Sequence, residues 1–144
     1  MDSIDLNIIH HLEKNCRLSH SELAKLVHLS RPSVYQRIAK LEKAGVIGGY
    51  KALIEWQHVK PCVKCLVFIK VNGKYFSTLE KSIVTMNVLH SVIESYHRLA
   101  GEWCMLLHVR LDKAEDVTLF LDELWTFEGV LETSTTFVLD SKSF

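Results

Sequence analysis

The stretch from residue 19 to residue 50 constrains this chain most, because it has the pattern of two short helices joined by a tight turn. Ser19 and Glu22 have the S-x-x-E spacing of a capping box, in which the two residues satisfy each other's free backbone N–H groups. Ser30 is a second N-cap candidate, and Pro32 follows in the first turn of the next helix, where a missing N–H costs little. The pattern predicts a helix-turn-helix.

The second helix of this pair separates into a buried face and a polar face. Val34, Ile38 and Leu41 recur at i, i+4 and i+7 and therefore share the buried face. In a DNA-binding helix of this kind, Arg contacts phosphate or guanine, Gln pairs with adenine and Ser contacts either. We predict five DNA-binding residues on the remaining surface: Arg31, Ser33, Gln36, Arg37 and Lys40. The alternative is that each is an ordinary solvated residue of a surface helix.

The flanking segments complete an N-terminal domain. Upstream, Ile4, Ile8 and Leu12 recur every four residues, which predicts one more amphipathic helix. Downstream, residues 50–54 (YKALI) predict a strand. We therefore expect a winged helix-turn-helix domain over residues 1–54.

Charge is divided between the two halves of the chain. Residues 1–50 contain seven Lys/Arg and five Asp/Glu, a net charge of +2, whereas residues 51–144 contain ten and twelve, a net charge of −2. The positive half is the one with the predicted DNA-binding helix. Because the excess is small, we expect modest non-specific affinity for each subunit and a need for dimers.

The second half predicts a different fold. Residues 55–62 (EWQHVKPC) show no clear period, and we interpret them as a hinge. Strand patterns then cover residues 63–71, 88–99, 103–110 and 130–139, and helical patterns cover residues 76–86 and 117–124. Two helices on one face of a four-stranded antiparallel sheet make a ferredoxin-like βαββαβ sandwich, so we expect an α+β chain with its second domain over residues 63–144.

Both faces of this sheet are apolar. In the first strand Val63, Cys65, Val67, Ile69 and Val71 alternate with Lys64, Leu66, Phe68 and Lys70. In the third strand Trp103, Met105, Leu107 and Val109 alternate with Cys104, Leu106 and His108. Two helices cover only one face, so we predict that the other face forms a sheet-to-sheet homodimer. The alternative is an exposed Leu and Phe of no significance.

Composition excludes several other classes of protein. The chain has 144 residues and is 48% hydrophobic, enough for one ordinary domain or two small ones. Its first residues are acidic and no apolar run reaches membrane-spanning length, so we expect a soluble cytoplasmic, nucleoid-associated protein without a signal peptide or a membrane partner. The few scattered cysteines suit reduced thiols better than disulfides.

With both halves interpreted, the chain resembles the Lrp/AsnC (feast/famine) family of transcription regulators over nearly its full length. The resemblance rests on the segments IDLNIIHHLEKNCRLSHSELAKLVHLS, RPSVYQRIAKLEKAGVIGGYKALI and RLAGEWCMLLHVR. It implies a DNA-binding regulator, an N-terminal winged helix-turn-helix and a C-terminal ligand-sensing domain. It also implies dimers that assemble further, to a tetramer of dimers (octamer), and amino acids as the usual effectors.

The resemblance also implies an effector site near the turn between the second and third strands, at contacts between subunits. The common family pattern there is Gly-Asp-Tyr-Asp, whereas this chain has Gly101, Glu102, Trp103 and Cys104, and so lacks the second acidic residue. A zwitterionic amino acid needs donors for its carboxylate and an acceptor for its ammonium. Gly101 N–H and Arg98 could donate, and Glu102 could accept. The alternative is that these residues only form a hairpin turn.

Two other functions remain as alternatives to a regulator that is not an enzyme. Some tetrapyrrole (siroheme-type) decarboxylases resemble this family, and Tyr96, His97 and His108 would be the candidate pocket residues here. Cys62 and Cys65 form a single CxxC, which is weak evidence for a thiol or metal sensor. We expect no catalytic residue, no metal site and no cofactor.

Overall fold

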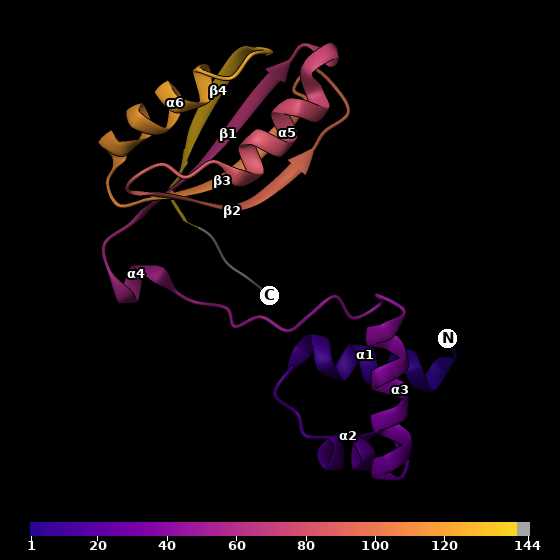
Figure 1. Cartoon of the computed structure of the whole chain (residues 1–144). Helices are drawn as coiled ribbons and strands as arrows, with labels where there is room; N and C mark the ends of the chain where they lie inside the picture. Colours follow the sequence, from indigo (N-terminus) through magenta and orange to yellow (C-terminus); the bar gives the residue numbers. More distant parts are fainter. Residues whose placement is uncertain (141–144) are drawn as a thin grey trace. The chain divides into compact units, whose positions relative to one another are not determined.

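The computed structural model describes residues 1–140, so the last four residues of the predicted second domain lie outside the described part. The chain divides into two compact units, Met1–Ile54 and a second unit that begins at Glu55 (Figure 1). Each unit has a separate hydrophobic core. Among residues 1–140, no helix has the length and apolar character needed to cross a membrane.

The first unit contains the three predicted helices, α1 (Ser3–Lys14), α2 (His20–Leu26) and α3 (Arg31–Lys43). Side chains cap each of them. The predicted box is confirmed, because Ser19 N–H donates to Glu22 Oε2 at 2.7 Å and Glu22 N–H donates to Ser19 Oγ at 3.2 Å. Ser30 caps α3, with Pro32 in its first turn. The helices enclose a core made of Ile8, Leu12, Leu23, Ala24, Val27, Val34, Ile38 and Leu41.

The strand predicted over residues 50–54 is wrong for the single chain, since this segment has no regular secondary structure. A strand needs a neighbour that accepts and donates its backbone hydrogen bonds. An alternating sequence cannot show whether such a neighbour exists, and the first unit contains none among residues 1–54.

The second unit is the predicted βαββαβ fold. Its strands are β1 (Val63–Val71), β2 (Ser91–Arg98), β3 (Met105–Leu111) and β4 (Val130–Val138), and its main helices are α5 (Phe76–Thr85) and α6 (Val117–Trp125). The strands pair antiparallel in the order β2-β3-β1-β4. Both helices pack on the same face of this sheet (Figure 1).

The helix-covered face carries the core, and the other face is less buried. Val67 and Leu107 are fully buried against Phe120 and Ile83 from the helices. On the opposite face Leu66, Phe68 and Leu106 are only half-buried. The predicted alternation of β1 is therefore correct, and it leaves an apolar face that α5 and α6 do not cover.

The predicted alternation fails at the start of β3. Trp103 was expected beside Met105, and Cys104 on the opposite face with Leu106. Instead, Cys104 N–H donates to Ile69 O at 2.9 Å and its side chain packs against the core, while the Trp103 ring lies 6.1 Å from the Phe68 ring on the other face. Alternation requires regular strand geometry, and these two residues precede the strand.

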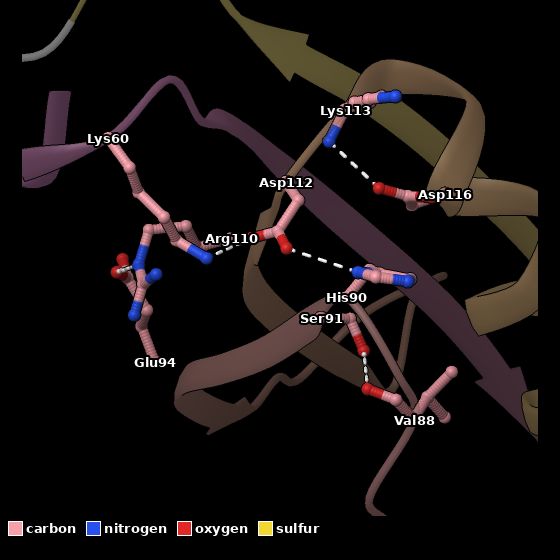
Figure 2. A network of polar contacts seen from close by, with 9 residues as sticks. All are labelled: Lys60, Val88, His90, Ser91, Glu94, Arg110, Asp112, Lys113 and Asp116. Carbon is pink, nitrogen blue, oxygen red and sulfur yellow. Dashed lines mark hydrogen bonds and ion pairs between the residues drawn. The ribbon is translucent and has the colours of Figure 1, made fainter.

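The segment predicted as a hinge contains a short helix, α4 (Trp56–Val59), and contacts the second unit. The Arg110 guanidinium lies 4.1 Å from the centre of a Trp56 ring. Lys60 Nζ donates a hydrogen bond to Asp112 Oδ1. The other carboxylate oxygen, Asp112 Oδ2, lies 3.1 Å from His90 Nδ1 (Figure 2). A hinge within residues 55–62 stays a prediction, but this segment is anchored to the second unit.

Candidate functional site

The polar face of α3 presents three of the five predicted DNA-binding side chains to solvent. Arg31, Gln36 and Lys40 are exposed, whereas Val34 and Ile38 of the same helix face the core. The first turn of α3 contains no acidic side chain, so it combines a positive residue with the positive end of the helix dipole. This surface is suited to a polyanion.

Ser33 is committed to the cap of its own helix. Its Oγ lies 2.8 Å from Ser30 Oγ, and its N–H donates to the same Ser30 oxygen. The residue as a whole is half-buried. Contact between Ser33 and a base would therefore require the cap to share or release this hydroxyl.

Arg37 is engaged inside the unit. Its Nη1 donates to Asp2 Oδ2 at 2.8 Å and to Asp5 Oδ1 at 2.6 Å. The same two carboxylates form the capping box of α1, in which Asp2 accepts from the Asp5 N–H and Asp5 accepts from the Asp2 N–H. Arg37 therefore ties the first turn of α1 to the middle of α3.

These contacts favour the charged forms of all three groups. The pKa of Asp2 and the pKa of Asp5 are each lowered, first by the capping N–H and then by the Arg37 guanidinium. The pKa of Arg37 is raised by its bonds to both carboxylates. The guanidinium and the carboxylates thus remain paired at neutral pH.

Sequence reasoning missed Tyr35. Its side chain is 58% exposed, and its ring stacks edge-on against His20 with centroids 5.4 Å apart. Tyr35, His20, Arg31 and Gln36 line a hollow of about 320 Å³ at the N-terminal end of α3. Tyr35 lies outside the i, i+4, i+7 spacing of the core residues, and this spacing is the signal that could have identified it.

A second hollow lies on the other side of Gln36. It measures about 530 Å³ and is lined by Asp2, Ser33, Gln36, Arg37 and Lys40, among others. Because Gln36 lines both hollows, it is the most central exposed polar residue of α3. The predicted DNA-binding residues thus lie together on one surface, although two of them have partners within the chain.

The predicted effector turn joins the end of β2 to the start of β3, near Lys70 at the end of β1. Gly101 has φ +143°, a conformation that side chains rarely adopt. Glu102 Oε1 lies 2.8 Å from Lys70 Nζ, and the same ammonium lies 2.7 Å from Glu132 Oε2 and 4.8 Å from the centre of a Trp103 ring. Lys70 lowers the pKa of Glu102, and the two carboxylates raise the pKa of Lys70.

Sequence reasoning did not identify Lys70 as part of this region. The strand register that brings β1 beside β4 pairs Lys70 with Glu132, and this pairing cannot be inferred from the spacing of residues along one strand. The structure thus gathers Glu102 and Trp103 around an unforeseen cation.

Arg98 and Cys104 lie elsewhere in the single chain. Arg98 pairs in register with Met105, on the helix-covered side, and its guanidinium lies 4.0 Å from the centre of the Phe76 ring. Cys104 turns toward the core. The five predicted effector residues therefore divide between the two sides of the sheet.

The structure gives no support to the two alternative functions. Burial raises the pKa of Cys65 to about 11, so its thiol stays protonated at neutral pH. Tyr96 pairs with Leu107 on the covered side, whereas His97 pairs with Leu106 on the open side, so they do not line one pocket. Among residues 1–140, no group of three or more His, Cys, Asp or Glu is placed to hold a metal ion.

Comparison with known proteins assigns each unit to a known domain family. Residues 1–42 match the model of the AsnC-type helix-turn-helix domain, and residues 64–143 match the model of the Lrp/AsnC ligand binding domain. The HTH-type transcriptional regulator LrpC of Bacillus subtilis is 33% identical over 123 residues, which cover 85% of this chain and 83% of that protein. The HTH-type transcriptional regulator FL11 of Pyrococcus furiosus is 27% identical, with 96% and 89% covered.

Solved structures have a similar fold. The structure of Bacillus subtilis LrpC has a TM-score of 0.83 and 31% identity, and the match covers 99% of this chain and 97% of LrpC. A Neisseria meningitidis transcriptional regulator in complex with L-Met has a TM-score of 0.86 and 24% identity, with 100% and 93% covered. At that identity the second likeness supports the fold alone.

Proposed function

This chain belongs to the Lrp/AsnC family of transcription regulators, and from that premise we propose how its surface recognises DNA. Arg31 and Gln36 read base edges in the major groove, and Lys40 contacts phosphate. The observation that carries this assignment is the exposure of these three side chains on one face of α3, around the two hollows. Ser33 and Arg37 act mainly by fixing α3, through the cap and through the bonds to α1.

The protein works as a dimer in this proposal. The open face of the sheet, with Leu66, Phe68 and Leu106 half-buried, packs on the same face of a second copy. An apolar face of an antiparallel sheet is favourable only when it is covered. Two copies would present two recognition helices to half-sites about 34 Å apart, one turn of DNA. Binding by both helices would compensate for the modest DNA affinity that the small positive charge gives each subunit.

The proposed effector is an amino acid that binds beside Lys70. The family model describes the second unit as a ligand binding domain, and the Neisseria relative holds L-Met. Here the Lys70 ammonium would hold the carboxylate, Glu102 would accept from the ammonium, and Trp103 would contact the side chain. An effector that changes DNA affinity must be affected equally by DNA, because the coupling free energy is shared.

Selection of duplexes from a random-sequence pool by the full chain tests the DNA proposal. We expect enrichment of a two-fold symmetric sequence, and Arg31→Ala should weaken binding to it while Arg17→Ala, an exposed residue outside α3, should not. Enrichment of no sequence, or equal loss with both variants, would reject the assigned surface.

A further inference from the structure

Two histidines lie side by side on the open face of the sheet. The ring centroids of His97 in β2 and His108 in β3 are 5.4 Å apart, with an angle of 59° between the rings. His97 pairs with Leu106 and Ser95 pairs with His108, so the two imidazoles are diagonal neighbours on one face. The register shift between Ile93 and Ser95 produces this placement, and residue spacing along either strand does not indicate it.

The separation suits one metal ion between the two rings. Imidazole nitrogens bind Zn²⁺ at about 2.0–2.1 Å, and two rings in a tetrahedral site then have centroids on the order of 5 Å apart. Zn²⁺, Cu²⁺ and Ni²⁺ are the ions that imidazole ligands favour. The observed geometry therefore needs little rearrangement to become a bidentate site.

One nitrogen of the pair has a partner within the chain. His108 is half-buried and lies on the same face of the sheet as His97. Ser95 Oγ lies 3.4 Å from His97 Nε2, and Ser95 pairs with His108, so a metal ion at this nitrogen would replace the serine hydroxyl.

The fixed charges near the pair are partly balanced. Glu94 Oε1 accepts from Arg110 Nε at 2.8 Å (Figure 2), and Glu94 Oε2 lies 4.0 Å from Lys64 Nζ. Lys64 disfavours and Glu94 favours positive charge at His108. A carboxylate thus lies close enough to offset part of the repulsion that an incoming cation would experience from the two basic groups.

We propose that His97 and His108 form a binding site for a borderline divalent metal ion such as Zn²⁺. Two imidazoles leave the remaining positions of the ion to water or to the same two residues of a second copy. This site lies outside the DNA-binding surface and the region around Lys70, but on the open sheet face that packs on a second copy in the proposed dimer, so a bound metal would lie at that interface.

Titration of the full chain with ZnCl₂ by isothermal calorimetry tests the site. We expect saturable binding, which His97→Gln weakens by at least about tenfold, since even residues that only orient a ligand cost 10–100-fold. His97 is exposed, so this variant should fold, as a circular dichroism spectrum will show. The matched control is the double variant His10→Gln/His11→Gln, which removes a pair of rings 6.3 Å apart on α1, one exposed and one half-buried, and should leave the affinity unchanged.

Cu²⁺ electron paramagnetic resonance gives an independent measurement. Hyperfine coupling to two nitrogens in the wild-type chain, and to fewer in His108→Gln, would support the site. Absence of saturable Zn²⁺ binding, or binding that His97→Gln leaves unchanged, would overturn it.

Discussion

The Nη1 atom of Arg37 lies 2.6 Å from Oδ1 of Asp5, a contact that joins the recognition helix α3 to the first turn of α1. Asp5 also accepts from the Asp2 N–H in the capping box. One carboxylate therefore serves both the local start of a helix and a contact across the unit. The position of Arg37 on the polar face of α3 predicted only a DNA contact and did not indicate this structural role.

We expect Asp5→Asn and Arg37→Ala to lower the Tm of the first unit and to weaken DNA binding to a similar degree. The Asp5 carboxylate cannot itself attract phosphate, so an equal loss would show that Arg37 acts by positioning α3. The decisive measurement is the salt dependence of affinity. A reduced slope in Arg37→Ala together with a normal slope in Asp5→Asn would mean that Arg37 contacts phosphate directly.

The same contact predicts an acid-dependent loss of stability. The folded-state pKa of Asp5 is lowered below its ordinary value of 3.8. The contribution of the Asp5 carboxylate to the free energy of unfolding is therefore complete above pH 3.8 and is lost as the pH falls through the folded-state pKa. The difference in unfolding free energy between wild type and Asp5→Asn should be constant from pH 7 to pH 5 and shrink below about pH 3.8. Urea unfolding at each pH measures it, and a difference that grows toward low pH would contradict the pairing.

Arg31→Ala should reduce affinity for the selected duplex by a factor of about 5–150, equivalent to the 1–3 kcal/mol expected for a lost bidentate contact to guanine. It should also relax the preference at one base position in each half-site. Lys40→Ala should instead weaken binding to all sequences alike. Fluorescence anisotropy with matched duplexes that differ at single positions separates the two outcomes.

Phe68→Asp should dissociate the proposed dimer, because a carboxylate would then be buried between two apolar sheet faces. Leu119→Asp is the matched control, since Leu119 is 50% exposed on α6, on the side of the sheet that the dimer leaves free. Analytical ultracentrifugation should report a monomer for the first variant only. A wild-type monomer, or a Phe68→Asp dimer, would exclude sheet-to-sheet assembly.

Cys65 should resist alkylation, while Cys16 should react. Burial raises the pKa of Cys65 to about 11, and only the thiolate is a nucleophile, whereas Cys16 is exposed. Mass spectrometry after iodoacetamide treatment at pH 8 should show modification at Cys16 and not at Cys65 until the chain is unfolded. Rapid modification of Cys65 in the native chain would revive the thiol-sensor alternative.

The sequence predicted most elements because their signals are local. Caps such as Ser19 with Glu22, and alternation such as that of Val67 with Phe68, depend on residues only a few positions apart, and the structure confirms both. The strand expected over residues 50–54 failed because pairing depends on a neighbour. Trp103 was placed on the wrong face because alternation does not extend into a turn.

The site was less predictable than the fold, because its contacts cross elements. The position of Arg37 within its helix predicts a side chain outside the buried face. Its bonds to Asp2 and Asp5 depend on the packing of α1 against α3, which the position within one helix does not indicate. Lys70 and His97 gain their neighbours through strand register and a bulge. A single sequence shows which residue types are present for such a site, but it does not show which of these side chains come into contact in the folded chain.

Lys70→Met should abolish the binding of an amino-acid effector to the second unit. Its ammonium is the cation that gathers Glu102, Glu132 and Trp103, so its loss removes the proposed carboxylate partner while the methionine retains the apolar stem. Lys74→Met is the matched control, because Lys74 is exposed and its ammonium lies 5.4 Å from the centre of the Tyr75 ring, outside this cluster. Thermal shift with a panel of the twenty amino acids should show stabilisation of wild type and Lys74→Met by the same ligand, and none of Lys70→Met. A ligand that stabilises all three proteins equally would place the effector elsewhere on the second unit.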